Sequence, residues 1–175
     1  MDLTVKNLGN VTASNVQESL SSDSPYVDVL DGTVTIPSIA ALEHFTIEDL
    51  FRVKVADLIE DGTQAQFVLT CTDGTQTWSN TFRMKLHAPV LTLADFRPMS
   101  NVGPGQSGTL LVSVRNDGSA ASHYTHVELY SSSTDVTFDQ TALYIWSIPA
   151  GETATAYFHF TVDGNVLMGS SYEMM

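Results

Sequence analysis

The sequence is poor in cysteine, in basic residues and in charge overall, and each shortage excludes a class of protein. The single cysteine, Cys71, excludes an internal disulfide and a cysteine-based metal cluster. Only 7 Lys+Arg stand against 20 Asp+Glu, and a net charge of −13 repels nucleic acid and anionic membrane surfaces. No apolar run has the length of a transmembrane helix. We therefore expect neither nucleic-acid binding nor membrane insertion.

What the sequence does contain is alternation of apolar and polar residues with a period of two. The pattern is clearest at residues 80–87, 109–117 and 153–162, where the alternation is typical of half-buried strands. Asp-Gly pairs, which favour tight turns, follow at residues 31–32, 61–62, 73–74, 117–118 and 163–164. Short strands joined by such turns predict an all-β sandwich or barrel.

The chain also repeats itself, without a gap, at an offset of 109 positions. We interpret the repeat as two tandem modules, residues 1–88 and 89–175. The aligned positions expected in the two cores are Val5, Leu20, Ile36, Phe51, Val53, Val114, Leu129, Ile145, Phe160 and Val162. The same offset places Asp49 opposite Phe158, an inward position, and we expect a β-bulge near Asp49.

The offset further predicts that each module is incomplete at one end. Residues 90–108 have no counterpart in the first module, and residues 66–88 have almost none in the second. We expect the first module to lack its opening strand and the second to lack its closing strands; the alternative is that their ends differ genuinely. Because open sheet edges recruit further strands, we expect self-association, with residues 170–175 at an intermolecular edge or poorly packed.

Several turns and strands resemble the bacterial immunoglobulin-like modules of the CARDB and NEW3 type. The residues that carry the resemblance are Pro104, Gly105, Val112, Val114, Asn116, Gly118, Ile148, Pro149, Gly151, Phe158 and Phe160. Residues 3–14 repeat the pattern in the first module, whose later turn has Leu42 in place of Gly151.

This resemblance implies two tandem immunoglobulin-like β-sandwiches that serve as accessory modules. Such modules are found in large secreted or cell-surface proteins of Bacteroidetes, and gingipain-like cysteine peptidases are the most similar in style. The first partners that the resemblance implies are neighbouring domains of the same polypeptide.

No metalloprotease, nucleophile-elbow or phosphate-loop motif occurs, so we predict no catalytic residues, no enzyme activity and no cofactor in this chain. Carboxylates are the one enriched functional group. Asp28 with Asp31, and Asp135 with Asp139, lie near equivalent turns and are calcium candidates. Because calcium takes about six to eight oxygen ligands, solvated surface acids are the simpler interpretation of these pairs.

Aromatic residues offer a different kind of site, a platform for carbohydrate. The candidates are Trp78, Tyr144, Trp146, Tyr157 and Tyr172, although their strand positions favour packing in the core or between sheets. Two functions remain: a non-catalytic spacer or accessory pair in a secreted or cell-surface protein, or an adhesin-type module that binds a glycan or a protein. An exposed aromatic cluster or bound calcium would favour the second.

Overall fold

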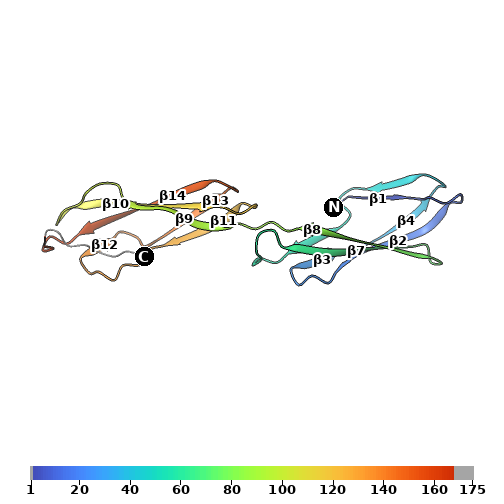
Figure 1. Ribbon diagram of the computed structural model, residues 1–175, viewed down its shortest axis with the longest axis horizontal. Helices are drawn as coiled ribbons and strands as arrows, with labels where there is room; N and C mark the ends of the chain where they lie inside the picture. The colour runs from blue at the N-terminus through green and yellow to red at the C-terminus, as the bar shows by residue number, and fades with distance from the viewer. Residues whose placement is uncertain (1, 168–175) are drawn as a thin grey trace. The chain divides into compact units, whose positions relative to one another are not determined.

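The computed structural model describes residues 2–167. It divides the chain into two compact units, Met1–Leu86 and His87–Met175, which we call the first and second units. The described residues form fourteen strands and no helix, and the predicted all-β, immunoglobulin-like fold is confirmed (Figure 1). Consequently no described helix could cross a membrane. The strand expected at residues 170–175 lies outside the described residues.

The first unit contains eight strands in three hydrogen-bonded groups. They are β1 (Leu3–Lys6), β2 (Ala13–Ser22), β3 (Val27–Asp31), β4 (Thr33–Ile39), β5 (His44–Ile47), β6 (Arg52–Val55), β7 (Gln64–Thr72) and β8 (Thr77–Lys85). The largest sheet has the order β4-β2-β7-β8, and the pairs β1-β5 and β3-β6 form the other two groups. All pairings are antiparallel, as hairpin-rich alternating sequence favours.

The described residues of the second unit form the remaining six strands, in two groups. They are β9 (Leu91–Pro98), β10 (Ser107–Asn116), β11 (Ser122–Glu128), β12 (Val136–Phe138), β13 (Ala142–Ile148) and β14 (Thr153–Val162). One sheet has the order β12-β14-β10-β9, and β11 pairs with β13 (Figure 1). The fully buried Leu110 and Phe158 belong to the core between them.

The strand positions follow the sequence repeat. Strands β2, β3, β4 and β5 begin 109 residues before β11, β12, β13 and β14, respectively, and β4 also ends 109 residues before β13. Six of the ten predicted core positions are buried: Leu20, Ile36, Phe51, Leu129, Phe160 and Val162. Val5, Val53, Val114 and Ile145 are half-buried and pack against the buried clusters. The predicted register is therefore correct.

The two units differ where the first unit interrupts a long strand. Strand β14 is continuous, whereas its counterpart is divided into β5 and β6. Asp49 lies in the interruption with a left-handed φ of 49°, and its backbone N–H donates to Asp2 Oδ1 at 2.9 Å. The expectation of a β-bulge is thus replaced by a complete break, which leaves Asp49 exposed instead of inward.

The units also differ at their sheet edges. In the second unit β10 pairs with β14 on one edge and with β9 on the other. Strand β1, the equivalent of β10 in the first unit, pairs with β5 alone among the described strands. In the first unit β2 pairs with β4 on one edge and with β7 on the other, and β8 pairs with β7. Strand β11, the equivalent of β2 in the second unit, pairs with β13 alone among the described strands. These edges are where the sequence predicts additional strands, and that prediction remains to be tested.

Candidate functional site

The four calcium candidates lie on exposed or loop-flanking positions. Asp28 lies opposite Lys54 in the β3-β6 register. The Asp31 carboxylate forms an ion pair with Arg52, with Nε and Oδ2 3.0 Å apart. Asp135 and Asp139 flank β12. Within residues 2–167, no group of three or more His, Cys, Asp or Glu side chains is placed to hold a metal ion. Arg52 supplies a counter-charge beside Asp31.

The structure brings a different set of residues together, on the outer face of β11 and β13. Tyr124 and His126 of β11 lie beside Trp146 and Tyr144 of β13, and we call these four residues the aromatic face. The Tyr124 and Trp146 ring centroids are 4.5 Å apart, and those of His126 and Tyr144 are 4.7 Å apart. Tyr124, Tyr144 and Trp146 are 61%, 70% and 69% exposed, so the rings pack on one another and remain open to solvent.

Strand alternation explains why this face looks outward. In β13 the half-buried Leu143 and Ile145 pack against the core, so the intervening Tyr144 and Trp146 point to the opposite side. The expectation that the candidate aromatics pack inside is therefore wrong for both. It is also wrong for Trp78 and Tyr157, each about half exposed, and Tyr172 lies outside the described residues.

The first unit shows that the fold itself does not need aromatic residues on this face. At the positions equivalent to Tyr124, His126, Tyr144 and Trp146, the first unit has Asn15, Gln17, Thr35 and Pro37. All four are exposed, on strands β2 and β4 that pair in the same register. The rings are thus an addition to the second unit, since the same architecture forms without them.

One residue of the aromatic face also has a costly backbone conformation. Tyr124 has a φ of 51°, and the equivalent Asn15 has a φ of 52°. Asn tolerates the left-handed region well, because its short side chain bonds locally, whereas other non-glycine residues pay a strain of about 1–3 kcal/mol there. Strain of this kind is concentrated at functional sites, and an exposed Tyr gains no core burial to offset it.

The aromatic face is suited to binding. It offers ring surfaces together with the Trp146 indole N–H and the Tyr hydroxyls as hydrogen-bond donors. The exposed Glu128, two residues beyond His126 on the same strand, adds a carboxylate acceptor. Neither Tyr124 nor His126 was among the sequence candidates; comparing outward positions across the 109-residue offset would have found both.

The only cysteine is not an activated nucleophile. Burial raises the pKa of the Cys71 thiol to about 12, with the neighbouring Glu18 adding to the shift. A thiol with this pKa is overwhelmingly protonated near neutrality. Cys71 packs against the small cluster of Val16, Ile36 and Ile39, where it acts as an apolar side chain.

One of three comparisons with known proteins, the match to a family model, agrees with this architecture. No curated protein matches the chain. One solved structure, described as a protein of unknown function from Porphyromonas gingivalis W83, is 16% identical over 93% of this chain and 73% of its own. Its TM-score of 0.32 is too low for any of its properties to be transferred. The CARDB family model matches residues 88–174, which are nearly the whole second unit. The second unit of this chain therefore belongs to CARDB, a family of non-catalytic, bacterial immunoglobulin-like domains.

Proposed function

We propose that the chain is a non-catalytic accessory module pair whose second unit binds a neutral glycan on the aromatic face. The observation that carries this proposal is the exposure of Tyr124, Tyr144 and Trp146 on a face that the first unit builds from polar residues and proline. Sugar rings present C–H groups that pack on aromatic rings, while their hydroxyls bond to polar side chains or water. A shallow face suffices for this mode of binding.

The charge of the molecule selects among glycans. The net charge is −13, and Glu128 lies next to the rings. An anionic glycan would be repelled by both, whereas the hydroxyl groups of a neutral glycan can donate hydrogen bonds to the Glu128 carboxylate. A protein partner is the competing occupant, because Tyr and Trp also dominate protein interfaces.

Calorimetric titration with neutral and uronate-containing oligosaccharides tests the proposal. We expect neutral oligosaccharides to bind and Trp146→Ala or Tyr144→Ala to weaken binding at least about tenfold, as loss of a central aromatic contact does. Trp78→Ala is the matched control, since it removes a comparably exposed indole from the first unit. Preference for uronates, equal loss in the control, or no neutral binding at millimolar concentration would each contradict the proposal.

We further propose that the pair acts within a larger secreted or cell-surface protein, as accessory modules do, and that this protein is a bacterial peptidase. The support is the resemblance of the chain to modules of such proteins. The sequence encoded on either side of residues 1–175 tests it directly. An adjoining catalytic peptidase domain is the expected result, and a protein without one would contradict the peptidase context.

A further inference from the structure

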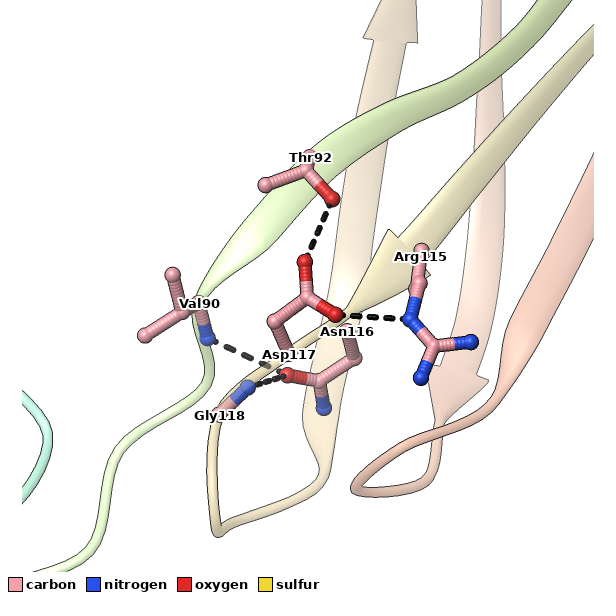
Figure 2. Close-up of polar contacts among 6 residues, drawn as sticks. All are labelled: Val90, Thr92, Arg115, Asn116, Asp117 and Gly118. Carbon is pink, nitrogen blue, oxygen red and sulfur yellow. Dashed lines mark hydrogen bonds and ion pairs between the residues drawn. The ribbon is translucent and has the colours of Figure 1, made fainter.

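A buried asparagine closes one corner of the second unit. Asn116 Nδ2 donates to the backbone oxygens of Ala120, at 2.8 Å, and Ile148, at 2.9 Å. Its Oδ1 accepts from two backbone N–H groups, those of Gly118 at 3.0 Å and Val90 at 3.1 Å (Figure 2). Val90 immediately precedes β9, so this side chain fixes the start of the strand that covers the edge of β10.

The first unit builds the same corner with one contact fewer. Asn7 Nδ2 donates to Val11 O at 2.8 Å and to Ile39 O at 3.0 Å, and Asn7 Oδ1 accepts from Gly9 N at 2.9 Å. These three bonds are the equivalents of three Asn116 bonds. Among residues 2–167, no second backbone N–H reaches Asn7 Oδ1, so the position that Val90 holds in the second unit has no described counterpart.

The glycine at each corner indicates what passes over it. A Cβ at Gly118 would collide with Ala88 O and Val90 N, because the chain entering β9 lies directly on this glycine. A Cβ at Gly9 would meet Asn7 Oδ1 at 3.2 Å as its sole neighbour among the described residues. Gly9 therefore keeps open the space that an entering backbone occupies at Gly118.

A groove continues from this corner along β1. It has a volume of about 500 Å³. Its lining includes Val5, Val16, Cys71 and Trp78 from β1, β2, β7 and β8, together with Leu8 and Val11 from the loop between β1 and β2. In the second unit, β9 pairs with the equivalent edge of β10, with Leu91 opposite Asn116 and Leu93 opposite Val114. The groove thus begins at an edge of β1 that no strand in residues 2–167 pairs with, and it is bordered by the exposed apolar side chains of Leu8, Val11 and Trp78.

The two corners differ at one residue, Leu8 against Asp117, and this difference predicts which side chain of an added strand would fit the first unit. In the second unit, Asp117 accepts from Thr92 Oγ1 of β9 at 2.8 Å and from Arg115 Nε at 2.6 Å (Figure 2). The first unit has Leu8 at this position, and Leu8 is 79% exposed. A strand lying on β1 would therefore place an apolar side chain, instead of a threonine, against Leu8.

We propose that the edge of β1 is a strand-acceptor site, which takes an extended apolar segment of polypeptide supplied from outside residues 1–175. The segment pairs antiparallel with β1, donates one backbone N–H to Asn7 Oδ1, crosses Gly9, and sets an apolar side chain on Leu8. Main-chain hydrogen bonds of this kind supply affinity, and the alternate side chains in the groove supply specificity. This site is independent of the aromatic face.

A synthetic peptide copied from residues 88–95 of the same chain, with Thr92→Leu, is the probe. In a Trp146→Phe background, Trp78 is the sole tryptophan and borders the groove, so its fluorescence reports binding. We expect saturable binding with a Kd below about 1 mM, and at least about tenfold weaker binding when the peptide nitrogen matching Val90 is methylated. No binding of the unmethylated peptide, or equal binding of both, would overturn the proposal.

Three protein variants separate this site from a structural role. Gly9→Ala fills the crossing space and should abolish binding without lowering the melting temperature of the first unit. Gly118→Ala, the matched change, should destabilise the second unit because its Cβ has no room. Leu8→Asp should shift the binding preference from the peptide that carries Thr92→Leu to the peptide that keeps the native Thr92. Unchanged binding by Gly9→Ala, or unchanged preference by Leu8→Asp, would overturn the register.

The remaining occupant is a second copy of this chain. Sedimentation of the 175-residue chain distinguishes it from a foreign segment. We expect that the β1 edge does not mediate a dimer, so that Gly9→Ala leaves the sedimentation of the chain unchanged. A concentration-dependent dimer that this substitution dissolves would overturn the proposal and assign the edge to self-association.

Discussion

At the scale of single residues, Glu18 is the side chain least suited to its position. It is 1% exposed in β2, and within residues 2–167 its carboxylate oxygens have no strong hydrogen-bond donor. Burial raises the pKa of Glu18, and the facing Cys71 thiol offsets the shift only in part. The equivalent residue of the second unit is Val127, an ordinary core side chain. The first unit therefore retains an ionisable group where its repeat is apolar.

This placement predicts a pH dependence of the first unit. Because the folded state holds the Glu18 proton more tightly than the unfolded state, stability is greatest below the ordinary pKa of 4.5 and falls as pH rises through the raised pKa. Glu18→Gln should remove this decline and raise stability at pH 7 by on the order of 1–3 kcal/mol. Urea unfolding followed through Trp78, in a Trp146→Phe background, measures it. Parallel pH profiles for both proteins would show that Glu18 is not the cause, and Asp28→Asn is the exposed-acid control.

Tyr124 is the second residue whose conformation and identity disagree. Replacing it with Asn, the residue of the first unit, relieves about 1–3 kcal/mol of left-handed strain but loses a ring contact worth about 0.5–1.5 kcal/mol. We expect Tyr124→Asn to be at least as stable as the parent while binding glycan more weakly. Trp146→Ala loses the same ring contact without relieving the backbone, so it should be less stable than Tyr124→Asn. The reverse order in thermal unfolding would contradict the strain assigned to Tyr124.

At the scale of elements, the turn before β5 repeats the turn before β14 with an unfavourable residue. Glu43 N donates to Ala40 O at 3.2 Å, and Glu152 N donates to Pro149 O at 3.1 Å. The third residue of each turn is left-handed, with φ of 66° at Leu42 and 78° at Gly151. The turn forms in the first unit although its sequence lacks the proline and glycine of the second.

A reciprocal exchange tests that account of the turn. Leu42→Gly should stabilise the first unit by about 1 kcal/mol, since glycine adopts a positive φ without a steric penalty and the Leu42 side chain is exposed. Gly151→Leu should destabilise the second unit by a similar amount. Chemical denaturation of both variants measures the effects. Destabilisation by Leu42→Gly would mean that the leucine side chain contributes more than its backbone costs.

Elements also show how far the sequence could predict this molecule. Alternation and Asp-Gly turns place the strands, and the repeat places the core, because both depend on local spacing. Strand β13 escapes such reasoning, since Leu143 and Ile145 on one face and Tyr144 and Trp146 on the other are all apolar. Alternation identifies two faces without deciding which is buried. At Asp49 the sequence does signal an irregularity, because a charged residue falls at an inward position, but it does not distinguish a β-bulge from a complete break.

At the scale of the whole molecule, one module has been used twice with different surfaces. The first unit has three polar residues and a proline on this face, Asn15, Gln17, Thr35 and Pro37, and no strand beyond β5 pairs with β1 among the described residues. The second unit has β9 on the equivalent edge and rings on the equivalent face. Because the two cores correspond position by position, with Glu18 against Val127 as an exception, differences at outward positions are free to serve binding.

Exchanging one face for the other tests this central claim most directly. The variant Tyr124→Asn, His126→Gln, Tyr144→Thr and Trp146→Pro gives the second unit the face of the first, including a proline that the edge strand β4 already accepts. Calorimetric titration and thermal unfolding of the full chain are measured together. We predict a second unit that melts within a few degrees of the parent and no longer binds neutral glycan. Unfolding of the second unit, or retained glycan binding, would contradict the claim that the rings are added for binding.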